Sequence, residues 1–129
     1  MSTTITVRYH ECDPMGVAHH AAYAIWLEMA RTELLRQHAG MSYRECEETG
    51  VFFVVVRLNI VYKTPARYDD TLNVECTFAK IGYVKIDHAY RIMRGDTLIA
   101  TATTTIACVD RAGVPQQVPD LIRATNISD

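Results

Sequence analysis

The feature that most constrains the fold of this chain is a single change in the spacing of its apolar residues. Ahead of Gly40 the apolar residues recur at helical spacing, at Tyr23, Leu27, Ala30 and Leu34. A glycine directly after such a run is typical of a helix end. After Gly50 apolar and polar residues alternate with a period of two, which is typical of β-strands. The sequence therefore predicts one long helix followed by a run of strands.

Strand patterns stand on both sides of the long helix. Residues 4–10 alternate between polar and apolar side chains, and four later segments also predict strands, at residues 51–64, 71–80, 83–94 and 97–110. The segment 51–64 begins with apolar residues on both sides, which predicts a strand buried on both faces. The connections between the later strands are short and rich in turn-forming residues. Neighbouring strands are therefore expected to pair as antiparallel hairpins.

Two shorter helical segments are also predicted. Ser42 followed by Glu45 is the pattern of a capping box, and it predicts a short helix that ends near Gly50. The tail, residues 114–129, is expected to hold a single helical turn.

The order of these elements is an α+β pattern. It predicts the hotdog fold, in which a curved antiparallel five-stranded sheet wraps around one long central helix. The length of 129 residues suits a single domain that spans residues 1–129. One helix covers only one face of such a sheet, and open sheet edges favour aggregation. We therefore expect a homodimer or a homotetramer.

Composition argues against several classes of partner and location. The net charge is −2 and no run of Lys or Arg occurs, so nucleic acid is not an expected partner. The apolar runs fall far short of the roughly 18 residues of a membrane span. The first residues carry no signal-peptide pattern, so the expected location is the cytoplasm. The four cysteines are widely spaced and are expected to be reduced thiols, with Cys76 and Cys108 in the core.

The candidate functional residues stand between the first strand and the long helix. Asp13, Pro14 and Gly16 form a turn pattern, and His19 and His20 follow it. The free N–H groups and the dipole at a helix start stabilise a developing oxyanion. A carboxylate beside such a place suits acyl-transfer hydrolysis, because it attacks a carbonyl carbon or activates water. On spacing alone, Asp13 is either that carboxylate or an ordinary turn and cap residue.

The segment CDPMGVAHHAAY, residues 12–23, resembles the active-site signature of the 4-hydroxybenzoyl-CoA thioesterase family of hotdog proteins. The matching positions are Asp13, Gly16, Val17, His20 and Tyr23. Two later segments, WLEMARTELLR and YKTPARYDD, are similar to the branch typified by the bacterial Tol-Pal-associated acyl-CoA thioesterases. The resemblance implies hydrolysis of an acyl-CoA to a free acid and coenzyme A, without a metal or another cofactor.

The resemblance also implies a role for each matching residue. Asp13 is expected to be the catalytic carboxylate, either as a nucleophile or as a general base. The backbone amide of His20 is expected to polarise the thioester carbonyl, while its imidazole assists by holding water or substrate. Gly16 and Val17 belong to the turn at the oxyanion site, and Tyr23 is expected to contact the substrate.

Three further predictions concern the binding of coenzyme A, a possible metal site and the role of His88. Lys80 and Lys85 are expected to bind the phosphates of coenzyme A, because lysine is a suitable phosphate ligand. A metal site is disfavoured, since side chains that are neighbours in a strand point to opposite faces and adjacent histidines rarely share one ion; its ligands would be Cys12, Asp13, His10, His19 and His20. His88 lies on the apolar side of its strand and is expected to be a hydrogen-bonded core or interface residue.

Two other functions remain open. The hotdog fold also hosts thioester dehydratases, which pair a histidine with a carboxylate on the helix. Their His-Phe-Pro lead-in is absent, and Glu28 on the helix is expected to pair with Arg31 instead. A non-catalytic acyl-CoA-binding protein would not need Asp13. A fold does not fix a function, so the choice rests on the Asp13 segment.

Overall fold

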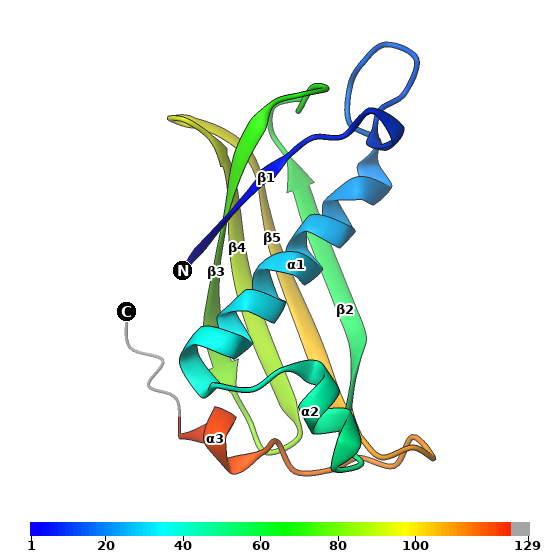
Figure 1. The fold of residues 1–129 in the computed structure, drawn as a ribbon, viewed down its shortest axis with the longest axis vertical. Helices are drawn as coiled ribbons and strands as arrows, with labels where there is room; N and C mark the ends of the chain where they lie inside the picture. Colours follow the sequence, from blue (N-terminus) through cyan, green and yellow to red (C-terminus); the bar gives the residue numbers. More distant parts are fainter. Residues whose placement is uncertain (125–129) are drawn as a thin grey trace.

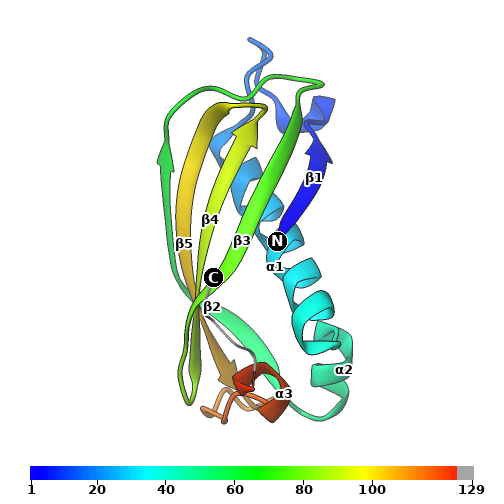
Figure 2. The same cartoon turned by 90° about the vertical axis from the view of Figure 1, so that its left-hand side faces the viewer.

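The computed structural model describes residues 1–124 of the chain. Helix α1 (His20–Ala39) lies across one face of a five-stranded antiparallel sheet (Figure 1). The strands are β1 (Ser2–Thr6), β2 (Phe52–Tyr62), β3 (Thr71–Ile81), β4 (Lys85–Arg94) and β5 (Thr97–Val109). The other helices are the 3₁₀ helix η1 (Tyr9–Glu11), α2 (Tyr43–Glu48) and α3 (Asp120–Arg123). The sheet and α1 form two layers, and the sheet curves along the helix (Figure 2), so the predicted α+β hotdog architecture is confirmed.

Local capping explains where α1 begins and ends. The ring of His19 accepts a hydrogen bond from the N–H of Ala21 at 3.2 Å and so caps the start of the helix. At the other end Gly40 adopts the left-handed conformation, with φ at 63°, as the sequence predicts for a C-terminal glycine. Ser42 and Glu45 form the predicted capping box of α2.

The tail forms the predicted helical turn as α3, and the rest of the predicted tail segment, residues 125–129, lies outside the described residues. Within residues 1–124, no helix is both long enough and apolar enough to cross a membrane.

The core lies between α1 and the sheet. Trp26, in the second turn of α1, is only 1% exposed, and Leu27 beside it is also buried. The alternation predicted for β3 is confirmed, because every second residue is buried, namely Leu72, Val74, Cys76 and Phe78. The four cysteines are free, as predicted, and Cys108 is buried like Cys76. Burying one large apolar side chain contributes roughly 1.5–3 kcal/mol, so this layer holds the helix on the sheet.

The order of the strands differs from the predicted succession of hairpins. The order is β1-β3-β4-β5-β2, so β2 pairs with β5 and forms one edge of the sheet. The prediction that β2 and β3 pair as a hairpin is therefore wrong. Residues 63–70 instead cross over the end of the sheet and run close to the loop that precedes α1 (Figure 1).

The prediction that the segment 51–64 is buried on both faces is also wrong. The exposed apolar residues of β2 are Val54, Val55, Val56, Leu58, Val61 and Tyr62. Within residues 1–124, β2 pairs with β5 alone. A continuous apolar run occurs both in central strands and in edge strands that form an interface. The composition of residues 51–64 therefore did not show which of these two kinds of strand β2 is.

His88 in β4 is buried as predicted, at 2% exposure, but it is not fully hydrogen-bonded. Within the described residues its Nδ1 atom has no hydrogen-bond partner. Its ring lies between those of Phe78 and Tyr90, with centroid distances of 5.2 and 6.1 Å. Burial, together with the nearby charge of Arg31, lowers the pKa of His88 to about 4. The imidazole is therefore neutral at neutral pH.

Candidate active site

The loop of residues 12–18, directly before α1, presents Asp13. The N–H of Asp13 donates to the carbonyl of Val17 at 2.9 Å. Its Oδ1 atom accepts from the N–H groups of Met15, at 2.9 Å, and Val17, at 3.2 Å. Gly16 turns the chain with φ at 78°, a conformation that glycine adopts at low cost. These bonds hold one carboxylate oxygen, while Oδ2 takes no part in them.

Three backbone contacts hold this loop against the rest of the molecule, and one of them runs from the N–H of Tyr68 to the carbonyl of Gly16 at 3.0 Å. His19 donates its N–H to the carbonyl of Glu11 at 2.7 Å, which closes the base of the loop. Ala18 donates its N–H to the carbonyl of Ala66 at 2.7 Å, so residues 63–70 form a wall beside the loop. Backbone bonds therefore hold the loop both at its base and along the wall of residues 63–70.

The wall of residues 63–70 is held by Arg94, at the end of β4. The guanidinium of Arg94 donates to Asp70 Oδ2 at 2.8 Å and to the carbonyl of Pro65 at 3.1 Å. Asp70 Oδ2 also accepts from the N–H of Arg67 at 2.8 Å. Burial raises the pKa of Asp70, but these hydrogen bonds and the charge of Arg94 outweigh it and bring the pKa below its ordinary value. The carboxylate of Asp70 is therefore ionised at neutral pH.

The start of α1 carries an uncompensated partial positive charge. Its first turn contains no acidic residue, so no side chain there offsets the helix dipole. The N–H of Ala21 is taken by the capping ring of His19. In the described part of the chain, the N–H of His20 has no acceptor. This donor is available to an oxygen atom of a substrate.

A pocket of about 280 Å³ opens beside the helix start. Its lining includes Val17, His20, Tyr23, Tyr62, Lys63 and Pro65. The hydroxyl of Tyr62 donates to the carbonyl of His20 at 3.1 Å, and the rings of Tyr62 and Tyr23 meet edge to face with centroids 4.8 Å apart. Burial raises the pKa of Tyr23, so its hydroxyl stays protonated. The free helix start thus lies at an open pocket, and the Asp13 loop meets this pocket at Val17, an arrangement that suits an attack on a carbonyl group.

Comparison with known proteins decides the family. Residues 7–125 match the family model described as the thioesterase-like superfamily. The chain belongs to the thioesterase-like superfamily. The match includes the Asp13 loop, α1 and all strands from β2 to β5, and it confirms the predicted resemblance.

Relatives within the thioesterase-like superfamily include named bacterial proteins. The chain is 37% identical over 109 residues to the acyl-CoA thioesterase YbgC of Haemophilus influenzae. This alignment covers 84% of this chain and 80% of the relative. The chain is also 33% identical over 122 residues to the acyl-CoA thioester hydrolase YbgC of Escherichia coli. This second alignment covers 93% of this chain and 90% of the relative. A crystal structure of a hypothetical protein, TT1821 from Thermus thermophilus, is similar with a TM-score of 0.89 at 37% identity. It covers 96% of this chain and 95% of that one.

The structure brings together some of the residues predicted for this superfamily signature and separates others. Those that line the pocket are Val17, His20 and Tyr23. Asp13 and Gly16 lie in the adjoining loop, where the N–H of Val17 bonds to Asp13. Lys80 and Lys85 lie at the β3–β4 hairpin, at the end of the sheet away from that loop (Figure 1), and line a separate pocket of about 360 Å³. Their contact with coenzyme A stays a prediction, without support from the arrangement within one chain.

The adjacent histidines contact each other. The rings of His19 and His20 lie with centroids 4.1 Å apart and planes tilted by 31°. Among the residues that the structure describes, no group of three or more His, Cys, Asp or Glu side chains is arranged to hold a metal ion.

Sequence reasoning missed three residues that shape the site, namely Glu11, Tyr62 and Arg94. The contacts of Tyr62 and Arg94 join segments 42 and 29 residues apart, and no local pattern predicts them. Glu11 carried a weak signal, because a charged residue stands two places before Asp13 in a segment that leads into a buried helix. Its burial and its partners are visible only in the structure.

Proposed function

We propose that this chain hydrolyses acyl-CoA thioesters to a free acid and coenzyme A. The observation that carries the proposal is the placement of the Asp13 loop: Asp13 is bonded to Val17, which lines the pocket, and the bond between Glu11 and His19, the cap of α1, closes the base of the loop. The names of the relatives from Haemophilus influenzae and Escherichia coli support the same substrate class.

In the proposed reaction the thioester carbonyl occupies the pocket with its oxygen at the N–H of His20. Negative charge develops on this oxygen when the carbonyl carbon is attacked, and the N–H and the helix dipole stabilise it. One such donor is typically worth about 10²–10³ in kcat. Because the donor belongs to the main chain, it is present whatever side chain stands at residue 20.

Asp13 supplies the attack by one of two routes. As a general base it takes a proton from the water that adds to the carbonyl carbon. As a nucleophile it forms an acyl-aspartyl anhydride, which water then hydrolyses. In both routes the carbon–sulfur bond breaks, the coenzyme A thiolate leaves and takes up a proton, and one water is consumed. Oδ2 is the oxygen left for either role, because Oδ1 accepts hydrogen bonds from Met15 and Val17.

We further infer that the working unit is a homodimer formed along β2, or a homotetramer built from two such dimers. An edge strand with exposed apolar side chains is a template for pairing with another chain, and β2 has both features. Tyr62 ends this strand and lines the pocket, so a second copy along β2 would cover the open side of the site. The cytoplasm stays the predicted location.

A panel of aliphatic and aromatic acyl-CoA substrates, with the released thiol detected by a chromogenic reagent, tests the proposed function. We expect enzyme-dependent thiol release from at least one member, with one free acid formed per thiol. If no member is turned over while calorimetry shows acyl-CoA binding, the non-catalytic binding protein is favoured. If an enoyl-CoA is hydrated without thiol release, the dehydratase is favoured.

A further inference from the structure

We propose that Glu11 is a positioning residue for this reaction: its buried carboxylate ties the Asp13 loop to α1 through Trp26. This inference rests on the proposed function, because it assigns to Glu11 the task of holding Asp13 in register with the helix start. Glu11 itself touches no substrate in this account.

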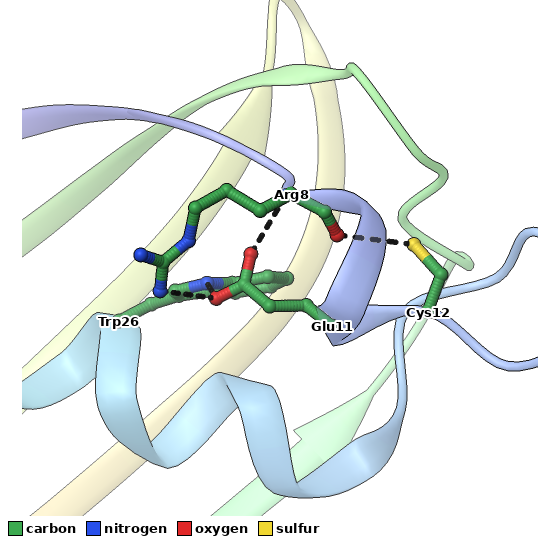
Figure 3. Close-up of polar contacts among 4 residues, drawn as sticks. All are labelled: Arg8, Glu11, Cys12 and Trp26. Atoms are coloured by element: carbon green, nitrogen blue, oxygen red, sulfur yellow. Dashed lines mark hydrogen bonds and ion pairs between the residues drawn. The ribbon is translucent and has the colours of Figure 1, made fainter.

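Glu11 has a buried carboxylate that bonds to Arg8, at the start of its own turn, and to Trp26 of α1 (Figure 3). It is 5% exposed. Its Oε1 atom accepts from the N–H of Arg8 at 2.8 Å. Its Oε2 atom accepts from the indole Nε1–H of Trp26 at 2.9 Å and from the Arg8 guanidinium at 3.2 Å. A buried charge is stable only with such partners, so the carboxylate fixes the end of the first strand segment against α1.

The main chain of Glu11 is bonded to the helix start as well. Its carbonyl accepts the N–H of His19, the capping residue of α1, at 2.7 Å. Glu11 is therefore joined to the helix twice, once through its side chain at Trp26 and once through its main chain at His19. One residue, Cys12, separates it from Asp13. A shift of Glu11 relative to α1 is expected to move Asp13 relative to the N–H of His20.

The other bonds of the Asp13 loop do not supply this connection. Asp13 bonds to Met15 and Val17 within its own loop, and the loop bonds to the wall twice, from Ala18 to Ala66 and from Tyr68 to Gly16. These contacts keep the loop in shape but do not reach the body of α1. A displacement of about 1 Å in a catalytic group can cost about 10²-fold in rate. The Glu11–Trp26 bond therefore acts on catalysis by fixing the distance between the carboxylate and the helix start.

The first test compares Glu11→Gln with Glu45→Gln in the full-length chain. Glu45 is an exposed control, because its carboxylate also accepts a backbone N–H, from Ser42 in the capping box of α2, but lies away from the site. We expect Glu11→Gln to lower kcat by about 10–10² with KM changed less than about threefold, since the group acts on geometry rather than on binding. Glu45→Gln is expected to leave kcat unchanged, because glutamine also forms a capping box.

Two readouts report on the bond without using activity. Trp26 is the single tryptophan of the chain, so its fluorescence emission is expected to shift in Glu11→Gln and not in Glu45→Gln. Hydrogen exchange of residues 12–20, followed by mass spectrometry, is expected to become faster in Glu11→Gln alone. If the wild-type protein turns over no acyl-CoA, the proposed function fails, and the exchange rates alone decide whether Glu11 holds the loop.

A milder variant covers the case in which Glu11→Gln does not fold. Arg8 has a side chain that is 56% exposed, so Arg8→Ala removes one hydrogen bond to Glu11 with little effect on the core. We expect it to lower kcat by about threefold and to speed exchange in residues 12–20 by a smaller amount. Unchanged exchange in this loop and an unchanged kcat, in whichever variant folds, would overturn the positioning role and leave Glu11 as a stabilising residue only.

Discussion

The hydroxyl of Tyr62, the last residue of β2, donates a hydrogen bond at 3.1 Å to the main-chain carbonyl of His20, the first residue of α1. This bond joins the edge of the sheet to the helix start at which we place the oxyanion. Tyr62 also lines the pocket, so one side of the pocket is formed by the strand that we expect to pair with a second copy of the chain.

Removing this hydroxyl tests whether the bond matters for turnover. Tyr62→Phe keeps the ring that packs on Tyr23 and loses only the hydrogen bond. We expect kcat to fall by about 3–10-fold, the effect of a neutral hydrogen bond of about 1 kcal/mol. Tyr9→Phe, at an exposed position that does not line the pocket, is the control and should behave like wild type. Equal activity of the two variants would show that the Tyr62 bond has no part in the site.

A comparison of His20→Ala with Asp13→Asn separates the backbone of residue 20 from its side chain. His20→Ala keeps the N–H at the helix start, so we expect a loss of about tenfold or less, well below that of Asp13→Asn. Rates are to be measured at saturating substrate, with and without a chelator. Equal collapse of both variants would contradict the backbone-amide role. Loss of wild-type activity in chelator would point to a metal.

The apolar edge of β2 predicts self-association. Light scattering at micromolar concentration should give the mass of a dimer or a tetramer. Val56→Lys puts a charge into the exposed apolar edge and should shift the protein toward the monomer, with a loss of activity. Val114→Lys, at an exposed apolar position outside the sheet, is the control and should keep the wild-type mass. A wild-type monomer would refute this assembly.

His88 predicts a loss of stability at mildly acidic pH. Its pKa in the folded protein is about 4, lowered by burial and by the charge of Arg31, against an ordinary value of 6.5. Between these values the unfolded chain binds the proton and the folded chain does not, so stability falls as the pH falls from 6.5 toward 4. The contribution is about 3 kcal/mol at most.

Urea unfolding of the wild type and His88→Leu at several pH values between 7 and about 4 measures this effect. The variant lacks the titrating group, so the free energy of unfolding should fall less steeply with pH than in the wild type. Identical slopes for the two proteins in this window would show that His88 is not buried in its neutral form.

Local signals in the sequence predicted local structure. The capping box of Ser42 and Glu45, the glycine at residue 40 and the alternation of β3 each act within a few residues, and each is found as predicted. The Asp13 turn is equally local, and its hydrogen bonds close within residues 13–17.

Contacts between distant segments could not be predicted in the same way. The partner of β2 is β5 rather than β3, because pairing is decided by the whole sheet and not by the length of a connection. The bond between Tyr62 and His20 has no counterpart in any spacing pattern. For His88, the apolar face of the strand predicted burial, but the missing partner of Nδ1 depends on which side chains surround it.

The most direct test of the account is the turnover of acyl-CoA by Asp13→Asn. This substitution keeps the shape of the side chain and one oxygen for the loop bonds, and it removes the negative charge needed by a base or a nucleophile. The substrate should be the best member of the acyl-CoA panel, and circular dichroism and Tm should show that the fold is kept. We predict that kcat falls by at least about 10². Purified, folded Asp13→Asn with a kcat near that of the wild type would contradict the central claim.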